Sequence, residues 1–181
     1  MAKLMVVGLG NPGREYERTF HNVGMMALER IFQAAREENP GAEASFRKHG
    51  GHFEYARIDD AIFVRPLVFM NESGIAVREA LRSFGANPAD LFVLHDESDL
   101  PVGEYKIVKG GSSAGHNGVQ SIIDHIGTED FSRVRIGIRN PNEVTRKKAG
   151  DFVLQSIPAE TDGIFSKVFG SIASDLRLKG L

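Results

Sequence analysis

The first glycine-rich loop of the chain constrains its fold more than any other stretch. The loop reads Gly8-Leu9-Gly10-Asn11-Pro12-Gly13 and follows a short apolar run at residues 3–7, which predicts a buried strand. Residues 25–38 then carry apolar side chains at helical spacing, which predicts a helix. A strand, a tight loop and a helix in this order are typical of α/β proteins, which place their chemistry where strands end and helices begin.

Two polar residues accompany this loop. His21 lies just before the predicted helix, and an imidazole takes up and releases protons near neutral pH. Asn11 offers a side-chain amide that both donates and accepts hydrogen bonds. The pair therefore indicates a functional site at the loop.

The glycines of the loop also match G-x-G-x-x-G, the dinucleotide-binding pattern. That pattern requires a helix that opens at the glycines and a second strand that ends in an acidic residue about 20 residues later. Here Pro12-Gly13 is turn sequence, and the residues near position 33 continue the predicted helix. The context disfavours a dinucleotide. A tight turn without function is the simpler alternative, but it leaves Asn11 and His21 unexplained.

Composition narrows the class of protein. The chain has 181 residues, which predicts one domain spanning residues 1–181. It has no apolar run long enough to span a membrane, no signal-peptide pattern and no cysteine, so we expect a cytoplasmic protein without disulfides or a thiolate nucleophile. The net charge is -2, but residues 101–150 carry 8 basic and 5 acidic side chains. Such a basic region indicates either a phosphate-binding face or an ordinary solvated surface.

The middle of the chain predicts a hairpin and then a helix. Residues 52–57 and 61–64 predict its two strands, and a helix is expected to end near residue 84. Phe69 and Met70, which precede this helix, are expected either in the core or in the wall of a pocket. Asn71 is expected either to cap the helix or to contact a ligand.

A second polar cluster follows the apolar strand predicted at residues 91–94. It begins His95-Asp96-Glu97, and acidic residues beyond a buried strand indicate a site at the carboxyl end of that strand. A metal site is one interpretation, but no fixed ligand spacing supports it. The other interpretation is a carboxylate that orients a histidine elsewhere, as in catalytic triads.

A later glycine-rich stretch contains Ser113 within the pattern G-x-S-x-G, between a predicted strand and a predicted helix. Hydrolases with that pattern place an acid and then a histidine later in the chain. After Ser113 the only histidines are His116 and His125, and the only acid between these two is Asp124. This arrangement disfavours a serine esterase, which stays open as an alternative.

The remaining pattern completes the predicted fold. Residues 104–109 and 133–138 predict strands, and residues 119–127 and 161–178 predict helices. The order of elements predicts an α/β protein, with one mixed, twisted sheet flanked by helices on both faces.

Three stretches together resemble a known family. They are the first loop with Tyr16, Thr19, His21 and Asn22; Phe69-Met70-Asn71 with Ser73-Gly74; and His95-Asp96-Glu97 with Asp99-Leu100-Pro101, Gly110-Gly111 and Gly115-His116-Asn117-Gly118. In this order and spacing they resemble the bacterial peptidyl-tRNA hydrolases. The resemblance extends from residue 4 to about residue 154, most of the chain.

The resemblance implies a monomeric cytoplasmic esterase of phosphorylase/hydrolase-like fold, without metal or cofactor and without membrane attachment. Its substrate would be peptidyl-tRNA, cleaved at the ester between peptide and tRNA. His21 would be the general base that activates water, Asp96 would hold His21 in its basic form, and Asn11 would recognise the peptide. The implied substrate-binding residues are Tyr16, Phe69, Met70, Asn71, His116 and Asn117. A relative that binds RNA without hydrolysing it is the alternative within the family.

The chain departs from the family pattern at three positions. Phe20 stands where arginine is frequent, Ala114 where glycine is usual, and Val108 where a lysine grips tRNA phosphate. The expected phosphate-binding residues are therefore Lys106, Lys109 and Arg135, and Arg133 is a further candidate on the same face, with the basic residues 146–148 behind them.

Overall fold

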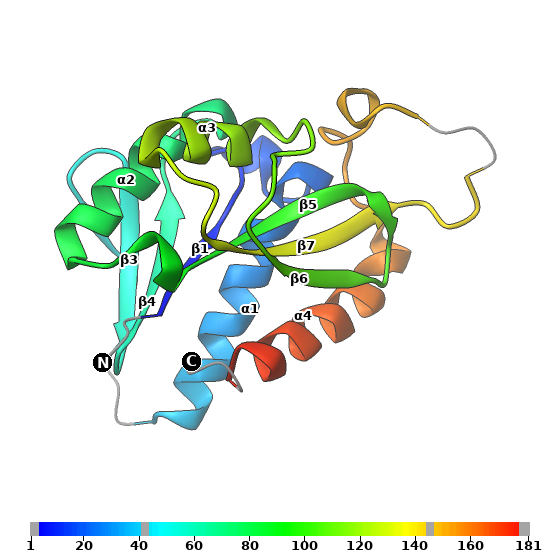
Figure 1. Cartoon of the computed structure of the whole chain (residues 1–181). Coiled ribbons are helices and arrows are strands. Elements are labelled where there is room, and N and C mark those ends of the chain that lie inside the picture. Colours follow the sequence, from blue (N-terminus) through cyan, green and yellow to red (C-terminus); the bar gives the residue numbers. More distant parts are fainter. Residues whose placement is uncertain (1–3, 41–43, 144–146, 178–181) are drawn as a thin grey trace.

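The computed structural model describes residues 4–40, 44–143 and 147–177. Seven strands form one mixed sheet (Figure 1), in the order β2-β3-β4-β1-β5-β7-β6. The strands are β1 (Met5–Gly8), β2 (Arg47–His49), β3 (Phe53–Ile58), β4 (Ala61–Pro66), β5 (Leu91–Pro101), β6 (Tyr105–Lys109) and β7 (Ser132–Arg139). The helices are α1 (Val23–Glu38), α2 (Ser73–Phe84), α3 (Asn117–Ile126) and α4 (Asp162–Arg177). Lys3, Arg146 and Leu178, which belong to segments discussed above, lie outside the described residues.

The central strands of the sheet run parallel. β1 pairs with β4 on one side and β5 on the other, and β5 pairs with β7. Antiparallel β3 and β2 extend one edge, and antiparallel β6 completes the other. Parallel strands need cover on both faces. Here α1 and α4 cover one face, and α2 and α3 cover the other (Figure 1). The predicted α/β class, mixed sheet and helices on both faces are confirmed.

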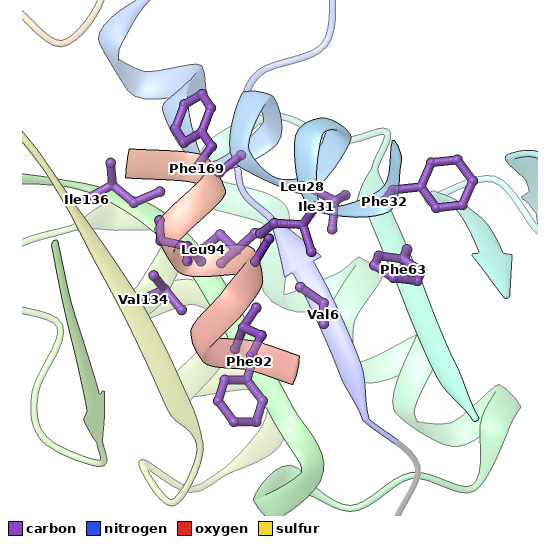
Figure 2. Packing of buried hydrophobic residues seen from close by; sticks show 14 of the residues in the cluster. Val6, Leu28, Ile31, Phe32, Phe63, Phe92, Leu94, Val134, Ile136 and Phe169 are labelled. Carbon is purple, nitrogen blue, oxygen red and sulfur yellow. The ribbon is translucent and has the colours of Figure 1, made fainter. Parts of the chain in front are cut away.

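Each central strand contributes to two hydrophobic cores, because successive side chains of a strand point to opposite faces. Val6 of β1 lies in the core beneath α1 and α4, and Val7 lies in the core beneath α2 and α3. On the first face, Leu28 and Ile31 of α1 lie over the sheet near Leu94 (Figure 2). Burying one side chain of this size stabilises the fold by about 1.5–3 kcal/mol, so the core beneath α1 and α4 fixes α1 relative to β5.

The start of α1 lies directly against β5 because residue 24 is glycine. A Cβ atom at Gly24 would lie 2.2 Å from the carbonyl oxygen of Leu94, a distance that no side chain tolerates. Close approach at this point brings His21, just ahead of α1, to the strand that carries Asp96. The first loop and the second polar cluster therefore meet at the carboxyl ends of the parallel strands, where open α/β sheets bind ligands.

Strand β5 is longer than the sequence predicts. The predicted strand ends at residue 94, whereas the observed strand continues to Pro101 because β7 pairs with it beyond that point. His95, Asp96 and Glu97 are consequently buried within the sheet and do not form a loop. The pattern missed this extension because ionisable side chains seldom occupy buried strand positions.

Candidate active site

The centre of the site is a hydrogen bond between two residues from different elements. His21 lies in the short helical turn that precedes α1, and its Nδ1 is 2.8 Å from Oδ1 of Asp96 on β5. The side chain of His21 is 12% exposed, and the side chain of Asp96 is 4% exposed. A carboxylate only accepts, so Nδ1 of His21 carries the proton and Nε2 is left with its lone pair. Within the described part of the chain, that lone pair has no hydrogen-bond partner.

His116 donates to the same carboxylate oxygen, from the other side. Its Nε2 is 2.9 Å from Oδ1 of Asp96. Its Nδ1 accepts hydrogen bonds from the backbone N–H groups of Gly118 and Val119, at 3.2 and 3.3 Å, and so caps helix α3. Because those N–H groups only donate, Nδ1 must hold the lone pair and Nε2 the proton. A second proton on His116 would break the cap and put positive charge at a helix N-terminus, which the helix dipole disfavours.

Asp96 is held as a carboxylate by these two donors. Burial alone would raise its pKa, but its interactions with His116 and His21, which include a hydrogen bond from each, outweigh burial and hold the pKa of Asp96 well below its usual range. The carboxylate is therefore ionised at any pH at which the protein would function. A buried negative charge beside His21 stabilises the imidazolium that forms when His21 takes a proton.

His21, Asp96 and His116 also form the kind of cluster that can hold a metal ion, with ligand atoms within 4.8 Å of one another. A histidine ligates a metal through a nitrogen lone pair. In His116, however, the nitrogen that faces Asp96 carries the proton, and its lone pair is occupied by the cap of α3. The arrangement of donors therefore matches a hydrogen-bond network better than a metal site. His95, the residue behind the metal interpretation of the sequence, is not part of the cluster.

Asn11 is held by Asn22 and by Met70. The backbone N–H of Asn11 donates to Oδ1 of Asn22 at 2.8 Å, and Nδ2 of Asn22 donates to the carbonyl of Asn11 at 3.0 Å. The backbone N–H of Met70 donates to Oδ1 of Asn11 at 2.8 Å. Since the amide oxygen is occupied, Asn11 offers its Nδ2 hydrogens as donors. Sequence reasoning gave no role to Asn22, whose only signal was its place in the first resembling stretch.

Met70 connects the first loop to the start of α3. It is buried, at 4% exposed, and its sulfur lies so close to Gly118 that a Cβ atom there would be 2.4 Å away. A Cβ atom at Gly118 would also lie too close to a methyl carbon of Leu9 and to Cε1 of His116. Met70 is therefore part of the core, and Gly118 is required for this close packing.

The other residues implied in substrate binding lie at the surface around this centre. Tyr16 and Phe69 form an edge-to-face pair with ring centroids 6.2 Å apart, and Phe69 is 50% exposed. Asn71 is exposed and does not cap α2, where no side-chain cap forms. Asn117 is exposed at the first turn of α3. An exposed phenylalanine, a half-buried tyrosine beside it and two exposed amides form a surface suited to a ligand with both apolar and amide groups.

A small cavity of about 110 Å³ lies beside the histidines. His21, Asp96 and His116 line it, together with Glu97, Ser98, Ser113, Ala114, Gly115, Asn117, Ala149, Gly150 and Val153. The wall at residues 149–153 lies far along the chain, and the backbone N–H of His21 donates to the carbonyl of Val153 at 2.8 Å. This contact, which no sequence pattern predicted, fixes the turn that carries His21.

Ser113 has no base among the described residues that could activate it. Its Oγ donates to Oε1 of Gln120 at 2.7 Å, and the residue is buried. His116, the nearest histidine in the sequence, has both ring nitrogens occupied by Asp96 and by the cap of α3. The geometry therefore disfavours the serine esterase alternative.

The basic residues proposed for phosphate binding differ in how free they are. Arg135 is paired with Glu97 through Nε and a terminal nitrogen, at 2.8 and 2.7 Å, and Lys109 is 3.1 Å from Asp130. Arg133 is buried and donates to the carbonyls of Gly110 and Ser112, so its expected place on a phosphate-binding face is wrong. Lys106, opposite Arg135 in the ladder, is exposed and has no ion-pair partner within the residues described. It is the most available cation of the set.

The family model and the curated relatives identify one family. The family model described as peptidyl-tRNA hydrolase matches residues 5–178. The peptidyl-tRNA hydrolase of Aquifex aeolicus (strain VF5) is 40% identical over 166 residues, which cover 91% of this chain and 83% of that protein. The crystal structure of peptidyl-tRNA hydrolase from Acinetobacter baumannii matches with a TM-score of 0.82 and 28% identity, over 98% of this chain and 89% of that one.

A more distant structure shares the fold alone. Isoform 2 of uridine phosphorylase from Schistosoma mansoni matches with a TM-score of 0.53 at 8% identity, over 97% of this chain and 86% of that one. The phosphorylase-like character expected of the fold agrees with this match. No helix in the described ranges is long and apolar enough to cross a bilayer.

Proposed function

The chain belongs to the peptidyl-tRNA hydrolase family, and we propose that it acts with His21 as the general base. It hydrolyses the ester between the peptide and the tRNA of peptidyl-tRNA and releases free tRNA and free peptide. The observation that carries the assignment of the base is the 2.8 Å hydrogen bond between Nδ1 of His21 and Asp96. This bond leaves Nε2 of His21 as a free lone pair beside a cavity.

The reaction begins with a water molecule bound to Nε2 of His21. As the water attacks the ester carbon, its proton passes to Nε2, and the imidazolium is stabilised by the carboxylate of Asp96. The carbonyl oxygen becomes an oxyanion, which needs hydrogen-bond donors. Nδ2 of Asn11 supplies one, because its amide oxygen is held by Met70. The ester C–O bond then breaks, and the ribose oxygen takes the proton from His21.

His116 contributes by limiting the site to one base. Because its Nδ1 lone pair caps α3, its Nε2 carries the proton and donates a hydrogen bond to Asp96. The proton abstracted from water therefore has one destination, Nε2 of His21. Two imidazole donors on a single carboxylate oxygen also fix the orientation of the His21 ring.

Substrate binding is assigned to the surface around this centre. Phe69, which is exposed, and the half-buried Tyr16 contact apolar parts of the substrate together with Met70, and Asn71 and Asn117 bind its amide groups. Tyr16 and Phe69 also suit stacking on a nucleobase, since every base has a π-face. Phosphate groups of the tRNA bind to Lys106, with Arg135 and Lys109 beside it.

We further propose that residues 1–181 act as a single domain and a monomer in the cytoplasm, where peptidyl-tRNA arises during translation. The proposed catalytic groups, His21, Asp96 and Asn11, all come from one chain. No cofactor enters the mechanism, because the base, the carboxylate and the oxyanion donor are side chains. Light scattering of the pure protein at assay concentration tests the monomer.

The function is tested by incubation of the protein with peptidyl-tRNA and measurement of free tRNA. We expect hydrolysis by the wild-type protein and its loss in His21→Ala. A protein that retains tRNA on a filter but releases no free tRNA would be the RNA-binding relative instead. Covalent labelling by a serine-directed inhibitor would favour the esterase at Ser113.

A further inference from the structure

His95 is a buried imidazole that the mechanism above does not use. It lies on β5, next to Asp96, and is 1% exposed. Its Nδ1 is 2.7 Å from the backbone carbonyl oxygen of Asp96. A carbonyl only accepts, so Nδ1 of His95 carries the proton. Its Nε2 is then a buried lone pair, and among the residues that the structure describes it has no hydrogen-bond partner. A buried polar atom without a hydrogen bond destabilises the fold, so the presence of a histidine at this position needs an explanation.

The hydrogen bond from His95 replaces one that the sheet cannot make. On the side of β5 that faces β1, the carbonyl of Leu94 accepts from the N–H of Leu9 at 3.0 Å. The carbonyl of Asp96, two residues further along, points the same way. At the level of Asp96, β1 has already ended at Gly8, and the loop that contains Asn11 has left the sheet. The carbonyl of Asp96 therefore has no backbone donor from β1. The imidazole of His95 therefore completes the strand where its neighbour departs.

The other side of the His95 ring contacts His116. The two rings pack in an edge-to-face arrangement with centroids 4.7 Å apart. His95 thus touches both partners of His21: it holds the backbone of Asp96 and packs against the ring of His116. The centroids of the His21 and His116 rings are themselves 5.1 Å apart, so His116 is packed between His21 and His95 in a chain of ring contacts.

We propose that His95 is a positioning residue for the hydrolysis of peptidyl-tRNA, which keeps Asp96 and His116 aligned so that His21 alone takes the proton. The proposal rests on the function proposed above and adds a residue to it. This role requires a neutral His95, because a positively charged His95 would compete with the imidazolium of His21 for the negative charge of Asp96. The charged and titratable groups near His95 are His116 at the N-cap of α3, Asp96 on its own strand and Arg133 on β7. Burial first, and then His116, lowers the pKa of His95 to about 3.

Two variants separate the two contacts of His95. In His95→Asn the side-chain amide retains a donor for the carbonyl of Asp96 but removes the ring that packs on His116. In His95→Phe the ring remains, and the donor is lost. We expect kcat to fall by about 10- to 100-fold in each, with KM changed by less than about twofold, because misalignment affects the reacting groups more than substrate binding.

The matched control is His125→Asn. His125 likewise donates from Nδ1 to a backbone carbonyl, that of Ser121 at 2.8 Å, but it lies near the other end of α3. We expect kcat of this variant to stay within about twofold of wild type. A similar fall in kcat for His125→Asn would overturn the proposal, since any lost imidazole would then have the same effect. Circular dichroism gives the folded fraction, and if His95→Phe does not fold, His95→Asn carries the test.

A second readout needs no substrate. In the proton NMR spectrum, Nδ1–H of His21 and Nε2–H of His116 should give two downfield resonances from their bonds to Asp96. We expect the His116 resonance to shift or broaden in both His95 variants and to stay unchanged in His125→Asn. Wild-type kcat in both His95 variants, or unchanged ring resonances in them, would overturn the proposal. If the wild-type protein does not hydrolyse peptidyl-tRNA, the proposed function fails, and the resonances still test His95.

Discussion

The side-chain oxygen of Asn11 accepts a hydrogen bond of 2.8 Å from the backbone N–H of Met70, which lies 59 residues further along the chain. This bond fixes which end of the amide faces the substrate. Since the oxygen is used internally, Nδ2 is left to donate to a carbonyl or to the oxyanion that forms from it. The first glycine-rich loop, which contains Asn11, and the segment around Met70 are thus joined in one site.

Replacement of the amide by a carboxylate, in Asn11→Asp, tests this orientation. The introduced carboxylate still accepts from the Met70 N–H but offers no donor, so we expect kcat/KM to fall by about 10²–10³, the cost of one lost oxyanion donor. Asn11→Ala should lose similar activity and also unfold more easily, because a buried N–H left unpaired costs about 1–3 kcal/mol. Kinetics and urea unfolding of both variants measure the two effects. Near-wild-type rates in Asn11→Asp would show that Nδ2 does not act in the reaction.

Most helices and strands of this protein could be predicted from sequence patterns, and the predictions that failed did so for physical reasons. Apolar side chains such as Val6, Val7 and Ile31 recur at strand and helix periods, so the elements and the α/β class could be predicted. The extension of β5 through His95 could not, because it depends on pairing with β7, and its polar residues hide the strand. Edge strand β2 carries no apolar alternation, so the sequence pattern does not predict it either.

The site divides in the same way. His21, Asn11 and Asp96 lie within short motifs, so they could be named as candidates from the sequence. The protonated nitrogen of His116 could not be inferred, because it depends on where the N-terminus of α3 lies in space. The burial of Arg133 and the pairing of Arg135 with Glu97 also depend on neighbours from other strands.

Loss of the general base should abolish most hydrolysis. We expect His21→Ala to lower kcat by about 10²–10⁴ while the protein stays folded, because the side chain is at the edge of the core. Ser113→Ala should change activity little, because the Oγ of Ser113 is bonded to Gln120 and, in a weak contact, to the N–H of Gly115, although Ser113 lines the same cavity as His21. Single-turnover kinetics with peptidyl-tRNA measure both. Wild-type activity in the first variant, or a collapse in the second, would assign the chemistry to another residue.

Removal of the carboxylate should change the pH dependence of the reaction. In Asp96→Asn the negative charge that favours a protonated His21 is gone, so we expect lower activity and an acidic limb of the pH–rate profile that moves to lower pH. The neutral amide also allows the His21 ring to adopt the wrong tautomer. The measurement is kcat/KM across the acidic and neutral range. An acidic limb at the same pH as in the wild-type protein would mean that Asp96 does not set the protonation of His21.

The phosphate contacts should appear in the salt dependence of binding. Lys106→Ala should raise KM, leave kcat largely intact and reduce the salt slope by about one contact. Lys109→Ala should do the same to a smaller extent, because Lys109 is already paired with Asp130. Arg135→Ala should weaken binding and also destabilise the fold, since Glu97, whose side chain is 8% exposed, would lose its partner. If KM and the salt dependence are unchanged in all three variants, the tRNA binds to another surface.

The buried His95 should make the protein sensitive to acid. Burial lowers its pKa to about 3, so between about pH 4.5 and pH 6 the unfolded chain carries a proton on His95 that the native protein lacks. Stability rises with pH wherever the unfolded state binds more protons, so this contribution is complete above about pH 6.5 and is lost as the pH falls toward about 3. One such proton gives a slope of about 1.4 kcal/mol per pH unit. Urea unfolding of wild type and of His95→Phe at a series of pH values measures it. We expect the slope of the variant to be smaller by about that amount, and equal slopes would mean that His95 is protonated in the folded protein.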